Sequence, residues 1–119
     1  MANELVIGIT ISFSKGGATY RDGVTDSVTI TGDTYTAGVQ SVATSNTEIV
    51  QGASLGTPGF VFIQNLDATN YVEFGTTNDA VYTVKCKAGE FAVFRCTGAT
   101  LYGKANTSAC NVKYVIFED

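Results

Sequence analysis

The sequence predicts an all-β protein, an antiparallel β-sandwich that is jelly-roll-like and begins with a long N-terminal strand. Short runs of apolar residues alternating with polar ones are separated by turn residues about every ten positions, as in sandwiches. Residues that suit a pleated, half-buried surface (Thr, Val, Ile, Tyr and Phe) are abundant. No segment carries a convincing helical pattern. These observations together favour many short strands.

The first predicted strand has the clearest pattern. One of its faces is apolar and consists of Leu5, Ile7, Ile9, Ile11 and Phe13. The other face consists of Val6, Gly8, Thr10 and Ser12. This period of two predicts a strand with one buried face. Ten residues of strand span roughly 33 Å, against a usual ~17–20 Å. Such a strand either crosses a whole sandwich or reaches past its own domain, and Gly16-Gly17 ends it.

Residues 22–54 are rich in Thr, Ser and Gly and are patterned more weakly. Arg21-Asp22-Gly23 predicts a turn, and short strands are expected around Val28–Ile30 and Tyr35–Val39. At 119 residues the chain has the length of one domain. We therefore expect a single β-sandwich domain over residues 1–119, with a partner-contacting segment within 22–54.

The second half is more aromatic. Phe60 to Leu66 (FVFIQNL) is almost continuously apolar, which is typical of a strand covered on both faces. Asp67 to Asn70 predicts a hairpin loop built on Asx and ST turns, and Ala88-Gly89-Glu90 predicts a tight turn. Further strands are expected over Phe91–Cys96 and Cys110–Glu118.

Composition argues against several functions. The chain has no His, the commonest general base and metal ligand, and no spacing suggests a catalytic or metal site. Seven Lys and Arg against 11 acids, for a net charge of −4, do not build an obvious nucleic-acid surface. No apolar stretch reaches the length of about 18 residues that a membrane span needs. We therefore expect a protein that is not an enzyme and has no cofactor, nucleic acid or membrane partner.

Cysteines and aromatic residues are assigned mainly to packing. Cys86, Cys96 and Cys110 are expected to be reduced, buried hydrophobes, with one disulfide and one free thiol as the alternative. Most Tyr and Phe side chains fall at alternating strand positions and are expected in the core. Three tyrosines lie in looser surroundings and are the candidate contact residues for a sugar or another subunit: Tyr20, Tyr35 and Tyr102.

Three segments share an order with a known group of proteins. They are GTPGFVFIQNLDATNYVEFG (56–75), KAGEFAVFRC (87–96) and LYGKANTSACNVKYVIFED (101–119). This series resembles small structural proteins of tailed bacteriophage virions, in which an "NLDxTNYVE" element, a "KAGE" turn and an "LYxKAxT" element recur in that order. The N-terminal MANEL and the strand after it also fit. The three cysteines depart from this resemblance, since mostly aliphatic residues are expected there.

The resemblance implies a bacteriophage structural protein, most plausibly a capsid decoration (cement) protein that stabilises the assembled head by binding the major capsid lattice. Its partners would be the major capsid protein or other virion proteins, and copies of itself in a dimer or trimer. It would be synthesised in the host bacterial cytoplasm and end on the capsid surface of the virion. The alternatives are a tail or head–tail connector protein, and a glycan-binding module for host attachment, which would need an exposed aromatic cluster beside Asp and Asn.

Overall fold

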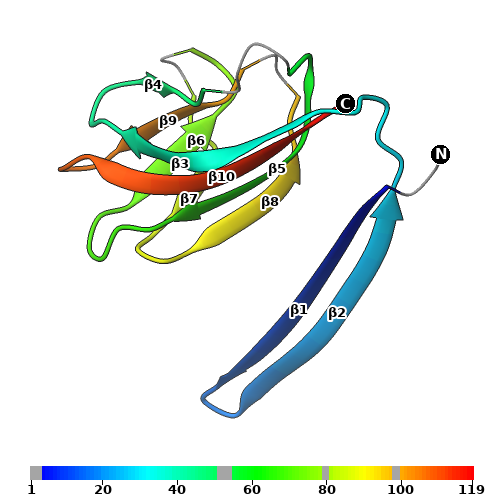
Figure 1. Cartoon of the computed structure of the whole chain (residues 1–119). Coiled ribbons are helices and arrows are strands. Elements are labelled where there is room, and N and C mark those ends of the chain that lie inside the picture. The colour runs from blue at the N-terminus through cyan, green and yellow to red at the C-terminus, as the bar shows by residue number, and fades with distance from the viewer. Residues whose placement is uncertain (1–3, 51–54, 79–80, 98–99) are drawn as a thin grey trace. The chain divides into compact units, whose positions relative to one another are not determined.

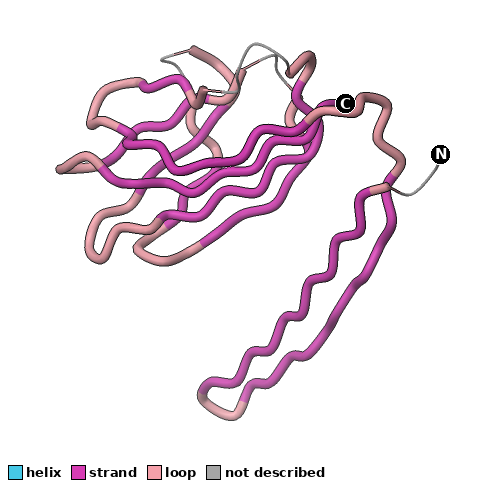
Figure 2. The backbone as a smooth tube through the Cα atoms, viewed as in Figure 1, coloured by secondary structure: helices cyan, strands magenta, loops and turns pink. Residues whose placement is uncertain are grey.

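The computed structural model describes residues 4–50, 55–78, 81–97 and 100–119, which contain strands and no helix. The chain divides into two compact units, residues 1–31 and 32–119, and each is described separately (Figure 1). The strands of the second unit form two sheets of four strands. The fold is therefore all-β and antiparallel, as the sequence predicts (Figure 2).

The first unit is one β-hairpin. Strand β1 (Leu5–Lys15) pairs with β2 (Ala18–Val28) without interruption, from Leu5 opposite Val28 to Lys15 opposite Ala18. Gly16 and Gly17 form the two-residue turn with φ angles of 58° and 85°. Type I′ turns need positive φ at both positions, and their twist matches that of the strands. The predicted long first strand is therefore present.

The turn predicted at Arg21-Asp22-Gly23 is wrong, because these residues lie in the middle of β2. They pair with Ser12, Ile11 and Thr10 respectively. Asp and Gly favour turns only when nothing else claims their backbone groups, and here the long partner strand offers a continuous ladder of hydrogen bonds.

Within its described residues, the second unit has eight strands in a jelly-roll arrangement. They are β3 (Tyr35–Val42), β4 (Thr47–Glu48), β5 (Pro58–Asn65), β6 (Val72–Gly75), β7 (Val84–Cys86), β8 (Phe91–Arg95), β9 (Tyr102–Ala105) and β10 (Cys110–Glu118). The first strand of this unit pairs with the last (β3 with β10), and the next pairs are β4 with β9, β5 with β8, and β6 with β7. This nested pairing, folded over into two sheets, is the jelly-roll arrangement. The sheet orders are β3-β10-β5-β8 and β4-β9-β6-β7.

The core lies between the two sheets. One sheet contributes side chains such as Val61, Ile63 and Ile116, and the other contributes Val72 and Phe74, all of them fully buried. Gly103 of β9 lies where space is tight, since a Cβ there would lie 3.2 Å from Val42 of the opposite sheet and 3.3 Å from the Phe74 ring of the neighbouring strand. A side chain at this position would push the sheets apart.

Asn65 is the buried polar residue of this core. Its Nδ2 donates to the carbonyl oxygens of Asn70 (2.7 Å) and Cys86 (3.1 Å), and its Oδ1 accepts from the N–H of Asp67 (3.0 Å). Asp67 Oδ2 in turn accepts from the N–H groups of Thr69 (3.0 Å) and Asn70 (2.7 Å). The predicted Asx chemistry of this loop is present. The predicted hairpin is not, because the loop joins β5 to β6 in the opposite sheet.

Candidate interaction surfaces

The N-terminal hairpin has two chemically different faces, because directly paired residues point to the same side of a ribbon. We call its apolar side the hairpin face: Leu5, Ile7, Ile9, Ile11 and Phe13 of β1 opposite Val28, Asp26, Val24, Asp22 and Tyr20 of β2, with Lys15 and Ala18 at the turn. The other side is mostly Ser, Thr and Gly. Ile11, Phe13, Tyr20 and Val24 are each at least half exposed.

Two carboxylates interrupt the hairpin face. Asp22 accepts a hydrogen bond from the Tyr20 hydroxyl (2.8 Å) and another from the N–H of Gly23 (2.8 Å). These bonds, that of Tyr20 first, hold the pKa of Asp22 below its ordinary value. Asp26 accepts from the N–H of Ser27 (2.9 Å). The face is thus apolar with a line of negative charge along β2.

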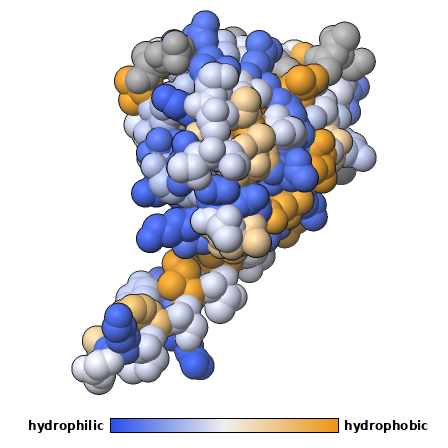
Figure 3. Space-filling view, turned by 90° about the vertical axis from the view of Figure 1, so that its left-hand side faces the viewer, coloured by the Kyte–Doolittle hydropathy of each residue, from blue (hydrophilic) through white to orange (hydrophobic). Residues whose placement is uncertain are grey.

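The outer surface of the β3-β10-β5-β8 sheet is also apolar. We call it the aromatic face, and it consists of Tyr35, Ala37, Val39, Phe60, Phe62, Phe91, Val93, Val115 and Phe117. The register places Ala37, Val115, Phe62 and Val93 in one row across all four strands. Tyr35, Val39 and Phe91 are 59–64% exposed, and Ala37 is also exposed. The other members of the face are half-buried: Phe60, Phe62, Val93, Val115 and Phe117. Figure 3 shows apolar side chains, in orange, at the molecular surface among polar ones.

The aromatic face is ordered by its own contacts. Tyr35 and Phe117 lie with ring centroids 6.1 Å apart, and so do Phe62 and Phe91, both pairs being tilted. The Arg95 guanidinium lies 4.6 Å from the centroid of the Phe60 ring and its Nη1 is 3.0 Å from Asp119 Oδ1. These contacts hold the rings in defined places, which gives the face a fixed shape.

Two cations, Lys113 and Arg95, lie in the rows of the aromatic face that the register defines. Lys113 of β10 lies between Val39 of β3 and Gln64 of β5 and is exposed. Arg95 marks the edge of the face on β8, where Asp119 pairs with it. The aromatic face therefore combines apolar rings with positive charge.

The outer surface of the β4-β9-β6-β7 sheet has the opposite character. We call it the charged face, and across its strands the register places Glu48 beside Tyr102, and Glu73 between Lys104 and Lys85. Lys85 Nζ lies 4.0 Å from the centroid of the Tyr71 ring. Mixed charges of this kind are typical of a surface that faces water.

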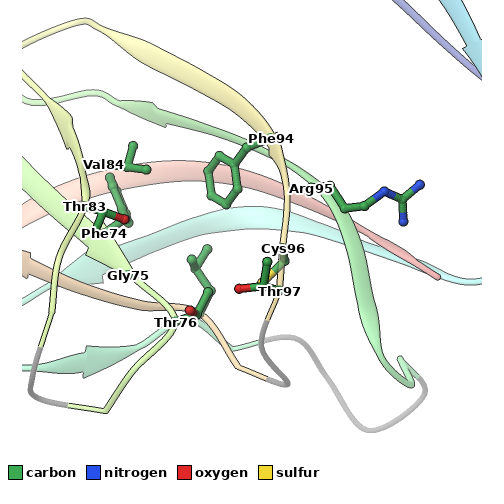
Figure 4. Close-up of a pocket in the computed structure, with 10 residues that line it drawn as sticks. Phe74, Gly75, Thr76, Thr83, Val84, Phe94, Arg95, Cys96 and Thr97 are labelled. Carbon is green, nitrogen blue, oxygen red and sulfur yellow. The ribbon is translucent and has the colours of Figure 1, made fainter.

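A pocket of about 190 Å³ opens beside β7 and β8. Phe74, Val84, Phe94 and Leu101 supply its apolar part, and the rest of the lining consists of Gly75, Arg95, Cys96 and three threonines. The Arg95 side chain points away from it (Figure 4). Within the described residues, no three His, Cys, Asp or Glu side chains are grouped so that they could hold a metal ion.

The three cysteines are buried and free, as expected. Burial raises the pKa of the Cys86 and Cys110 thiols, with smaller contributions from Glu90 and Asp67 respectively. A raised pKa keeps these thiols protonated and unreactive, which suits a packing role.

The structure distributes the three candidate tyrosines over three surfaces. Tyr20 lies on the hairpin face, Tyr35 on the aromatic face and Tyr102, half-buried, on the charged face. Tyr35 and Tyr102 belong to opposite sheets and are not brought together. Tyr20 and Tyr35 each join a larger apolar set.

Sequence reasoning missed most of the aromatic face, because it assigned the phenylalanines to the core. Phe74 is buried there, but Phe13 and Phe91 are 50% and 59% exposed. The expectation of a core position is wrong for both. The signal that could have identified the face is the nearly uninterrupted apolar run of β5, whose second face, with Phe60 and Phe62, lies on the outer side of the sandwich.

Comparisons with known proteins found no matching family model, no matching curated protein and no matching solved structure. Among the described residues, no helix has the length and apolar character to cross a membrane.

Proposed function

We propose that this chain is a structural protein of a tailed-bacteriophage virion, and that it decorates the assembled head by binding the capsid lattice. The aromatic face is the observation that carries the proposal. The jelly roll already buries a complete core between its sheets, so the outer rings of β5, β8 and β10 contribute little to its closure. Apolar patches of this kind mark interaction sites on soluble proteins.

The composition of this face supports a protein partner. Phe, Tyr and Arg are enriched where proteins meet, and Asp, Glu and Lys are depleted. The aromatic face holds five aromatic rings and Arg95, with Lys113 as its central charge. Jelly rolls also occur widely in viral capsids, which is an argument from analogy of fold.

Decoration would work by mass action. A protein that binds the assembled lattice and not the free subunits shifts the equilibrium toward the lattice. Many copies on one shell combine weak contacts into strong attachment. The sequence resemblance supports the same role, and the segments that carry it supply β5, β6, β8, β9 and β10 of the jelly roll.

The test is the copy number of this chain in purified particles of the phage that encodes it, measured by quantitative mass spectrometry against the major capsid protein. Hundreds of copies are expected for a decoration protein. About a dozen or fewer would overturn decoration in favour of a tail or connector role, and absence from particles would overturn the virion role. Particles that lack the chain should also lose resistance to heat or low salt.

A further inference from the structure

Two surfaces of this chain are apolar, and they are complementary in charge. The hairpin face is apolar with Asp22 and Asp26 along it, and Lys15 at its turn. The aromatic face is apolar with Lys113 inside it and Arg95 at its edge. We propose that the hairpin face of one copy packs on the aromatic face of a second copy. The proposal deepens the structural role proposed above by naming a second copy as the partner of both faces.

The hairpin needs a partner to be stable. An isolated two-stranded ribbon is marginal in water, and three or more strands or a packed face are required. Its 11 paired positions form a ladder with the apolar side chains gathered on one side. Cover on that side would bury Ile9, Ile11 and Val24 and make the long ribbon a fixed element.

The dimensions of the two faces agree. Strands rise about 3.3 Å per residue and lie about 4.8 Å apart, so the hairpin is about 36 Å long and about 10 Å wide. The strands of the aromatic face contain eight or nine residues in β3, β5 and β10. One ribbon therefore covers the length of the sheet and about two of its strands.

The charges favour a contact between a hairpin face and an aromatic face over a contact between two hairpin faces or two aromatic faces. Two hairpin faces in contact would bring Asp22 and Asp26 of one copy against Asp22 and Asp26 of the other. Two aromatic faces in contact would bring Lys113 of one copy against Lys113 of the other. Hairpin on sheet places carboxylates against cations in an apolar surrounding, where charge pairs discriminate most between partners.

The area that one contact buries is too small for a stable interface, so the contacts must close into a complete oligomer. The strands that receive the hairpin contain eight or nine residues and so are about 28 Å long. A contact about 28 Å by 10 Å removes about 280 Å² from each surface, and so about 560 Å² in all, which is less than the 1,200–2,000 Å² of a stable interface. Reciprocal exchange, in which each copy donates its hairpin and receives another, doubles the area to about 1,100 Å², which exceeds the roughly 1,000 Å² expected of a biological interface. The proposal is therefore a closed oligomer, with an exchanged dimer as its smallest form.

The first experiment is sedimentation velocity on the full chain, in which a closed dimer or small ring is expected. Ile9→Asp, in the middle of the hairpin face, should convert it to monomer. Thr10→Asp on the opposite side of the same strand is the matched control and should leave the oligomer intact. A monomeric wild type, or an Ile9→Asp protein that assembles like Thr10→Asp, overturns the proposal.

The second experiment tests the receiving surface. Val39 is exposed on the edge strand β3. Val39→Asp should weaken the association of the copies at least about tenfold, because it puts a carboxylate where the acidic hairpin binds. Lys104→Asn changes the net charge equally on the charged face and should have no effect. Thermal unfolding checks that each variant folds. Equal assembly of both variants overturns the role of the aromatic face.

A charge exchange identifies the pairing. Lys113→Asp alone, and Asp22→Lys with Asp26→Lys alone, should each assemble at least about tenfold more weakly than wild type. Mixing the two proteins should restore assembly, because each hairpin then meets a face of opposite charge. No recovery on mixing overturns the cross contact. A monomer present at hundreds of copies per particle would overturn this inference and keep the decoration role. An oligomer that is absent from particles would keep this inference and overturn the decoration role.

Discussion

The two outer faces of the jelly roll have the same backbone geometry and different chemistry. Both sheets bury alternate residues in one core, and both present the other residues outward. On one sheet the outward residues are Phe60, Phe62 and Val115 with their neighbours, and on the other they are charged residues such as Glu73 and Lys104. The charged face shows that the fold does not need an apolar exterior, which supports the proposal that a partner covers the aromatic face.

The largest expected effect tests whether aromatic rings inside the sandwich contribute more to the free energy of unfolding than rings on its outer face. Phe74→Ala should lower the free energy of unfolding by about 3–5 kcal/mol, because it opens a cavity between the sheets. The same change at Phe91, which is 59% exposed, should lower it by less than about 1 kcal/mol. Urea denaturation at low protein concentration measures both. Equal losses would mean that the aromatic face stabilises the monomer and would remove the contrast.

The next effect concerns the polar group that joins the sheets. Asn65→Ala should lower the free energy of unfolding by about 2–3 kcal/mol, because it leaves the carbonyls of Asn70 and Cys86 without their buried donor. Asn111→Ala, the same change at an exposed position of β10, should stay within about 0.5 kcal/mol of wild type. Chemical denaturation with both variants checks this. A small effect at Asn65 would show that water replaces its bonds.

A smaller effect separates the cations of the two faces. Arg95→Ala should lower the free energy of unfolding by about 0.5–1 kcal/mol, because it removes the stacking on Phe60 and the partly exposed pair with Asp119. Lys104→Ala on the charged face should be nearly neutral. Thermal melts at low and high salt measure the difference. If high salt abolished the whole stability loss of Arg95→Ala, the loss would come from the ion pair with Asp119 and not from the stacking on the Phe60 ring.

The smallest effect lies in the loop that crosses from one sheet to the other. The N–H groups of Asn70 and Thr69 hold the pKa of Asp67 below its ordinary value. The stabilisation is therefore present above the unfolded pKa of about 4 and is lost as pH falls through the folded pKa. Asp67→Asn should flatten the dependence of the melting temperature on pH below about 4. An unchanged profile would contradict this linkage.

The strands of the second half and the loop chemistry could be predicted from the sequence. Alternation placed Val112, Tyr114 and Ile116 on one face of β10, and all three are buried. Asp67 forms the expected Asx bonds. The hairpin expected there is wrong, because local residue types specify a reversal of the chain and not which strand will lie beside it. In a jelly roll, sheet partners such as β5 and β8 are distant in sequence.

The candidate surfaces could be predicted only in part. Tyr20 and Tyr35 were identified from their surroundings, and each lies on an apolar exposed face. Phe62 and Phe91 were assigned to the core, because a hydrophobic residue in a strand is usually buried. The row that joins Ala37, Val115, Phe62 and Val93 exists only after four separate strands pair in one register.

Local patterns in the sequence were enough to place most strands of the second half, the alternating faces of β1 and the turn at Gly16-Gly17, because these depend on neighbours within a few positions. They were not enough for β2, where the long partner strand overrides the turn residues Asp22 and Gly23. The tertiary structure decided which face is inside. Phe60 to Leu66 is apolar on both sides, and only the opposing sheet, with Val72 and Phe74, made Val61 and Ile63 core and left Phe60 and Phe62 outside. Burial is a property of what packs against a residue, and those contacts come from distant parts of the chain.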